Sequence, residues 1–177
     1  MLVGGAGDGA VRGYRSNTGE LMWTSNLHSE ATTGLVVSEL WEQIVSASSN
    51  GSLIACQIRG GVKLWERAVF ADQSGVTVMA AGEDIWTVFL GGECGVVVAV
   101  DVREGKELWR SEPAPFDVAA LHVVMPVGVP SFLAKYVYSF LLCEDSQGVI
   151  TARDTKVCLC NLPCPYDSLQ WPRNPGR

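Results

Sequence analysis

A pattern of two glycines and a tryptophan recurs three times in the first 110 residues, and it constrains the fold more than any other feature. Counted from an origin glycine, each copy has a small residue four positions on, a glycine ten positions on and a tryptophan fourteen positions on. The origins are Gly9, Gly51 and Gly95; the small residues are Gly13, Ala55 and Ala99; the later positions are Gly19, Gly61, Gly105 and Trp23, Trp65, Trp109. Three copies at a spacing of 42 and 44 residues indicate that each copy forms one supersecondary unit.

Each copy is predicted to consist of short strands. Leu2, Ile44 and Val88 stand seven residues before the origins and open apolar runs that end in polar or glycine-rich turns. The first 110 residues contain no capped segment with helical periodicity. Four short strands in such a period form a β-propeller blade; a solenoid of β-hairpins shares the period, but the turn residues and tryptophans favour the propeller. We therefore predict an all-β, partial β-propeller of about three full blades and a degenerate fourth, a fragment of a ring of about 7–8 blades.

The repeated residues are expected to be structural docking residues. A glycine at the tenth position supplies the positive φ of a tight hairpin turn. The tryptophan is a large rigid plate that can pack between adjacent blades. A surface for an aromatic ligand is the alternative role for the tryptophans, but their strict period favours packing. Trp41 and Trp86 mark the stretches between repeats.

The pattern weakens towards the C-terminus. A fourth copy begins at Gly148, but Cys158 and Leu162 occupy its expected glycine and tryptophan positions. We expect propeller blades over residues 1–160 and an irregular tail over 161–177, because three prolines within eleven residues are incompatible with a central strand. The first residues enter a strand without the features of a signal peptide, so we expect the chain to begin inside a larger fold.

Composition narrows the class of protein further. Hydrophobic residues make up 47% of the chain and the net charge is only −6, which excludes intrinsic disorder. An acidic chain without basic runs is not expected to bind nucleic acid. Residues 118–142 are long and apolar enough for a membrane-spanning helix. Their Val, Phe and Tyr content and the Pro126–Pro130 segment instead favour two strands separated by a loop.

The third copy carries a family resemblance. Its run from Ala99 through Asp101 and Gly105 to Trp109 resembles the tryptophan-docking repeat of quinoprotein-type (PQQ-like) propellers, Ala-x-Asp-x-x-Thr-Gly-x-x-x-Trp. The first and second copies depart from it, with Arg15 and Gln57 at the aspartate position. The resemblance implies the propeller fold and says little about activity, since many functions use this fold.

Residues 17–65 resemble more closely the luminal propeller of the largest subunits (subunit 1) of endoplasmic reticulum membrane protein complexes. That resemblance implies a non-catalytic interaction scaffold on the luminal side of the membrane, with other protein subunits as partners and a role in membrane-protein insertion and folding. The alternatives are a fragment of a PQQ-dependent dehydrogenase-type oxidoreductase and a propeller for outer-membrane assembly.

Candidate chemistry is sparse in the sequence. The vicinal cysteine pair of quinoprotein dehydrogenases is missing, because Cys56, Cys94 and Cys143 are isolated. Neither a nucleophile elbow nor a phosphate-binding Walker loop occurs. We therefore expect no enzyme activity, catalytic residue, cofactor or small-molecule substrate. Buried thiols are favoured over a zinc site at Cys158–Cys164, which lacks a paired fourth ligand, and an oxidising compartment stays open.

Overall fold

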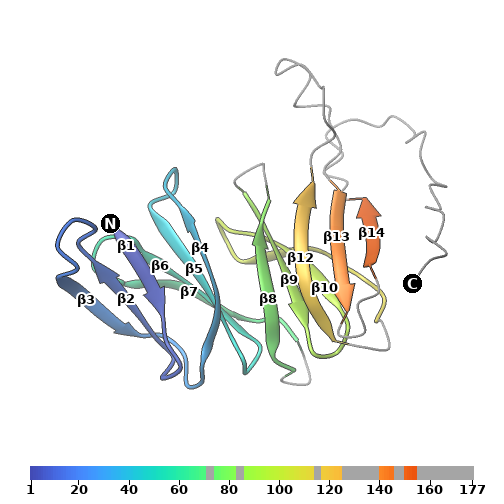
Figure 1. The fold of residues 1–177 in the computed structure, drawn as a ribbon, viewed down its shortest axis with the longest axis horizontal. Coiled ribbons are helices and arrows are strands. Elements are labelled where there is room, and N and C mark those ends of the chain that lie inside the picture. The colour runs from blue at the N-terminus through green and yellow to red at the C-terminus, as the bar shows by residue number, and fades with distance from the viewer. Residues whose placement is uncertain (71–73, 83–85, 114–116, 125–139, 146–149, 155–177) are drawn as a thin grey trace, which may run out of the picture.

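The computed structural model describes residues 1–70, 74–82, 86–113, 117–124, 140–145 and 150–154, with side chains placed as far as residue 123. These residues form antiparallel strands in four sheets and contain no helix (Figure 1). We refer to the sheets as blades I to IV in chain order. The predicted all-β, partial propeller is confirmed.

The blades are built as follows. Blade I contains β1 (Leu2–Gly5), β2 (Ala10–Tyr14) and β3 (Leu21–Asn26). Blade II contains β4 (Thr32–Ser38), β5 (Gln43–Ser48), β6 (Ser52–Gln57) and β7 (Lys63–Ala68). Blade III contains β8 (Val76–Ala81), β9 (Thr87–Gly92), β10 (Val97–Asp101) and β11 (Lys106–Arg110). Blade IV contains β12 (Val118–Val124), β13 (Phe140–Asp145) and β14 (Ile150–Asp154).

The sequence repeat maps onto the last three strands of each blade. The origin glycines directly precede or closely lead into β2, β6 and β10, and the repeated tryptophans lie on β3, β7 and β11. The first strands, β4, β8 and β12, fall between one repeat and the next and carry no repeat marker. The described strands therefore divide into two four-stranded blades and two three-stranded ones. Blade I has no counterpart of β4 within the described residues.

The four blades lie side by side in chain order (Figure 1). The first strands β4, β8 and β12 are neighbours across successive blades, so the blades approach one another along these strands. Residues 118–124 and 140–145 form two paired strands, as predicted for this apolar stretch, and the loop between them lies outside the described residues. Within the part of the chain that the structure describes, no helix has the length and hydrophobicity of a membrane span.

A β-bulge recurs at the same place in blades I, II and III. The register shifts directly after Gly13, Ala55 and Ala99, the small residues of the repeat. The outer strand thereby gains one unpaired residue just before its tryptophan, and these residues are Met22, Leu64 and Leu108. A bulge turns the extra residue away from the regular alternation of faces. This explains why three apolar side chains at equivalent positions are 42–53% exposed on the outer strands.

The hydrophobic core consists of separate clusters between blades. The blade I–II cluster is centred on Val11, Ile44 and Cys56. The blade II–III cluster is the largest and includes Val45, Leu53, Val88, Leu90, Val98 and Val100. The blade III–IV cluster contains Phe89, Val97, Ala99, Val118 and Leu121. Each joint between blades thus buries its own apolar surface, which is the main favourable term in holding the blades together.

Candidate functional site

The joint between blades I and II is built around Trp23. Within blade I, Trp23 pairs with Gly13, where an added Cβ would lie 2.4 Å from the indole atoms Cε2 and Nε1. Across the joint, a Cβ on Gly61 would lie 2.7 Å from Cε3 of the same ring. Trp23 is therefore held between a glycine of its own blade and a glycine of the next. Neither position has room for a larger residue.

The joint between blades II and III repeats this arrangement. Trp65 pairs with Ala55 in its own blade, and a Cβ on Gly105 would lie 2.7 Å from its Cε3 atom. Gly61 and Gly105 both have a φ of 66°, a left-handed conformation that only glycine adopts without strain. Both glycines therefore serve the turn and the docking contact together.

The remaining docking residues lie at the two ends of the series. Gly19 has the same left-handed backbone, with a φ of 72°, but no atom of the described residues lies within 4 Å of its added Cβ. Trp109 pairs with Ala99 and packs beside Phe89, with ring centroids 5.9 Å apart. The residue that would receive Trp109 in the repeat register is Cys158, which lies outside the described residues.

A second pair of tryptophans forms a surface at one end of the blades. Trp41 lies in the β4–β5 turn and Trp86 precedes β9 at the corresponding place in blade III. Their ring centroids are 4.8 Å apart and the planes are tilted by 55°. Trp41 is 36% exposed. In the sequence these two tryptophans mark only the stretches between repeats. Because they do not lie at the repeated tryptophan position, a role other than docking could have been inferred for them.

Asp101 and Arg103 support this tryptophan pair. The buried Asp101 carboxylate accepts hydrogen bonds of 2.9 Å from the Arg103 main-chain N–H and from its Nε–H. These bonds hold the pKa of Asp101 below its ordinary value, because they favour the ionised carboxylate. The Arg103 guanidinium lies 5.0 Å from the centroid of the Trp86 ring, within cation–π range. Asp101 therefore orients Arg103 over Trp86.

A groove of about 390 Å³ opens beside Trp41. We call it the Trp41 groove; it is lined by Trp41, Glu42, Gln43, Gln57, Arg59 and Leu64. Gln43 and Gln57 are cross-strand partners on β5 and β6, and the buried Gln43 Oε1 atom has no hydrogen-bond partner among the described residues. The Arg59 side chain is 88% exposed and lies 3.9 Å from the Glu42 carboxylate. The groove thus combines an apolar platform, two amides and an exposed arginine–glutamate pair.

Comparison with known proteins identifies the family. The family model described as outer membrane protein assembly factor BamB matches residues 1–140. The chain belongs to this BamB family of PQQ-like repeats. No curated protein matches the sequence. The PQQ-like part of the sequence-based resemblance is thereby confirmed.

Two computationally designed proteins share the fold. The Ika4 crystal structure aligns with a TM-score of 0.68 at 20% identity, covering 86% of this chain and 83% of Ika4. The Ika8 crystal structure aligns with a TM-score of 0.66 at 21% identity and covers 85% of this chain. The BamB-family chain spans 41% of the length of Ika8. At these identities the likeness shows the fold alone.

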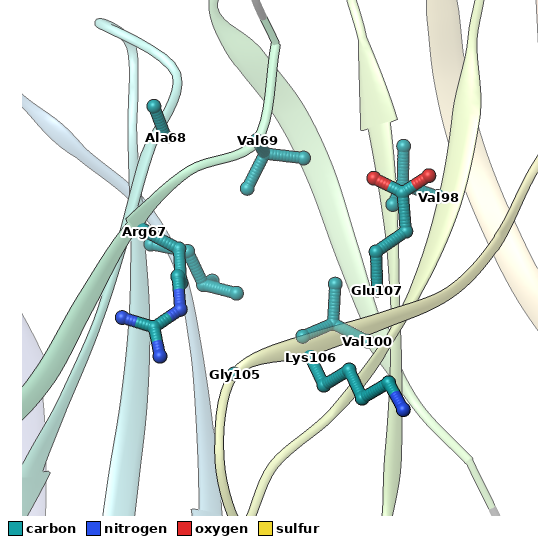
Figure 2. Close-up of a pocket in the computed structure, with 9 residues that line it drawn as sticks. Arg67, Ala68, Val69, Val98, Val100, Gly105, Lys106 and Glu107 are labelled. Atoms are coloured by element: carbon teal, nitrogen blue, oxygen red, sulfur yellow. The ribbon is translucent and has the colours of Figure 1, made fainter.

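A smaller cavity of about 260 Å³ lies in the joint between blades II and III (Figure 2). Arg67, Ala68 and Val69 line it from the β7 side, and Lys106 and Glu107 line it from β11. Two arginines cross the joint beside it. Arg67 donates to the Glu104 carbonyl at 3.1 Å, and Arg110 donates to the Val69 carbonyl at 2.7 Å. We assign this cavity to the blade joint of the BamB-family propeller, because it adjoins the glycine that receives Trp65.

Cys56 and Cys94 are free thiols. Cys56 is buried in the blade I–II joint, and burial raises its pKa to about 11. Cys94 is only half-buried, in the turn between β9 and β10. The described residues contain no group of three or more His, Cys, Asp or Glu side chains that could hold a metal ion. The cluster of Cys158, Cys160 and Cys164, for which zinc was the alternative, lies outside them.

Proposed function

We propose that this BamB-family chain is a non-catalytic scaffold that binds other proteins through the Trp41 groove. We further propose that it acts on the luminal side of the endoplasmic reticulum, in a complex that assists membrane-protein insertion and folding, as the resemblance of residues 17–65 implies. Its partners are then other protein subunits of that complex. The observation that carries the proposal is the exposed Trp41 beside the groove.

The composition of the groove supports protein binding. Tryptophan and arginine are enriched among the residues that contribute most to protein–protein affinity. Trp41 is partly exposed, but its ring packs against Trp86. The Trp86 ring in turn contacts Arg103, which a hydrogen bond to Asp101 holds in place. A braced aromatic platform loses little conformational entropy when a partner binds. Trp41 is therefore suited to anchor a partner.

The chemistry of the groove favours an extended acidic segment as the occupant. An apolar side chain of the segment contacts Trp41 and Leu64. The exposed amide of Gln57 both donates and accepts hydrogen bonds, as the main chain of an extended peptide requires. The exposed Arg59 guanidinium pairs with a carboxylate of the segment, forming a charge-assisted hydrogen bond. The proposal therefore commits to a segment in which an aromatic or aliphatic residue is flanked by aspartate or glutamate.

A peptide titration tests this occupant. The probes are two blocked peptides of equal length with a central Phe, one flanked by Asp residues and one by Lys residues, and binding is followed by NMR shifts of the glutamine side-chain amides. The acidic peptide is expected to bind more tightly than the basic one, and Trp41→Ala is expected to weaken it at least about tenfold. Leu108→Ala is the matched control, since Leu108 is a comparably exposed apolar residue on another blade. Equal effects of the two substitutions, or equal affinity for the two peptides, would refute the groove assignment.

The family match favours a second candidate within the same class. The matched model is described as an outer membrane protein assembly factor, which supports a scaffold role in outer-membrane assembly. Purification from native membranes distinguishes the two: recovery with a defined endoplasmic reticulum complex supports the first, and recovery with an outer-membrane assembly complex supports the second. A quinoprotein-type oxidoreductase is the remaining alternative. Titration with PQQ and Ca²⁺ followed by dye-linked alcohol oxidation tests it, and saturable turnover would overturn the non-catalytic proposal.

A further inference from the structure

The joint between blades I and II contains a buried histidine that the proposed function does not use. His28 lies between β3 and β4 and is 7% exposed. Its Nδ1 atom lies 2.6 Å from Ser52 Oγ and its Nε2 atom lies 2.8 Å from Ser46 Oγ. The Ser46 hydroxyl also donates to the Ile54 carbonyl at 3.2 Å. Both serines belong to blade II, so the imidazole connects the end of blade I to two strands of the next blade.

The same repeat positions are apolar at the next joint. His28 and Phe70 both lie nineteen residues after the origin glycine of their repeat. Ser46 lies five residues before the origin Gly51, and Ser52 lies one residue after it. The residues at the same two positions around the next origin, Gly95, are Leu90 and Val96. The polar set of His28, Ser46 and Ser52 is thus replaced as a whole by Phe70, Leu90 and Val96, which are buried in the blade II–III cluster. Two joints with the same docking geometry therefore differ at these three buried positions, which hold a histidine and two serines in one joint and three apolar side chains in the other.

We propose that the joint between blades I and II is an acid-sensitive joint, which loosens when His28 is protonated while the joint between blades II and III stays closed. A neutral imidazole satisfies both serine hydroxyls as one donor and one acceptor. A protonated imidazole has two N–H donors, so the serine hydroxyl that donated to the ring must turn and find another acceptor. The added charge is also buried between two blades, which is costly without a counter-charge.

The neighbouring charges do not offset this cost. Glu66 on β7 acts to raise the pKa of His28, but desolvation is the larger effect and the pKa is lowered overall. Glu66 is engaged by Lys63 at 2.9 Å. On the side of β1 and β2, Asp8 and Arg12 pair with each other, and Glu30 in the loop that follows His28 accepts a hydrogen bond from Ser49.

Because the pKa of His28 is lowered in the closed joint, acid weakens the joint. The folded joint holds histidine with a pKa below the ordinary value of about 6.5. Neutral His28 therefore stabilises the closed joint fully above about pH 6.5, and this stabilisation is lost as the pH falls below that value. At about pH 5 the loss can reach about 30-fold in the closing equilibrium, the limit for a group with an ordinary pKa when the joint is open.

Hydrogen exchange of the full chain at about pH 7.5 and about pH 5, corrected for intrinsic exchange rates, tests the proposal on the unmodified protein. Peptides covering β2 and β6 are expected to lose protection at the lower pH, by up to about 30-fold, and peptides covering β9 and β10 are expected to keep it. Equal changes at both joints, or no change at either, would overturn the proposal.

Two variants assign the effect to His28. The triple variant H28F/S46L/S52V installs the residues of the second joint and is expected to abolish the pH dependence of exchange at the first. His122→Gln alters the exposed histidine on β12 and is expected to preserve it. A triple variant that folds and still loosens at low pH would show that another group controls the joint, as would loss of the effect in His122→Gln.

Discussion

Substituting Gly61 by alanine separates the docking contact from the backbone requirement at the same residue. The substitution places a Cβ 2.7 Å from Cε3 of Trp23, so the ring or the blade must move. Overpacking of this kind costs about 1–3 kcal/mol. The left-handed φ of 66° adds about 1–2 kcal/mol for any residue with a Cβ. We therefore expect Gly61→Ala to lower the free energy of unfolding by about 2–5 kcal/mol.

Gly60 is the matched control for this prediction. Its φ is 92° and, in the part of the chain that the structure describes, no atom lies within 4 Å of an added Cβ, so Gly60→Ala carries the backbone cost alone. The difference between the two variants, about 1–3 kcal/mol, isolates the tryptophan contact. With a urea slope of about 2 kcal/mol per molar, it corresponds to about 0.5–1.5 M in the unfolding midpoint.

A double-mutant cycle completes the test. In a Trp23→Ala background the ring is gone, and Gly61→Ala is expected to cost no more than Gly60→Ala. The unfolding is followed by far-ultraviolet circular dichroism in urea, because removal of Trp23 changes the fluorescence. Equal midpoints for Gly60→Ala and Gly61→Ala in the parent chain would refute the docking contact. A docking penalty that persists without Trp23 would show that another neighbour limits the space.

Two further predictions concern single side chains. Cys94 is half-buried, whereas Cys56 is buried and its pKa is raised to about 11. A thiol reagent at about pH 8 is therefore expected to modify Cys94 first, which peptide mass mapping measures. Modification of Cys56 at the same rate would contradict its burial in the blade I–II joint. The lowered pKa of Asp101 means that its contribution is present above its ordinary pKa of 3.8 and is lost as the pH falls through the folded value. Asp101→Asn is therefore expected to reduce the acid dependence of the urea midpoint between about pH 6 and 3, and an unchanged dependence would count against the bonds to Arg103.

The sequence predicted the fold because the repeat encodes local geometry. A glycine that must adopt a positive φ and a tryptophan at a fixed distance from it leave few arrangements for the strands between them, and Gly61 and Gly105 occupy such turns. The assignment of the strands to blades was harder to predict from the sequence. The first strand of each blade, such as β4, follows the tryptophan of the preceding repeat and carries no marker of its own.

The candidate site was harder to predict for a physical reason. Trp41 and Trp86 come together only because equivalent turns of successive blades lie side by side, and their sequence separation of 45 residues gives no local signal. The exposure of Leu64 follows from a bulge, which interrupts the alternation from which burial is inferred. The His28 network could have been found by comparing repeats position by position, since the apolar residue at the equivalent place in the next repeat is Phe70.

The staggered docking of tryptophans onto glycines of the next blade is the central structural claim, and the proton shifts of the docking glycines test it most directly. An indole face held against a glycine shields its Hα protons through the aromatic ring current. Gly61 and Gly105 lie against Trp23 and Trp65, whereas a Cβ added to Gly19 has no described residue within 4 Å. In a ¹H–¹³C correlation spectrum, the Hα resonances of Gly61 and Gly105 are expected to lie well upfield of those of Gly19, and the shift of Gly61 is expected to disappear in Trp23→Ala. Similar shifts for all three glycines, unchanged in Trp23→Ala, would contradict the account.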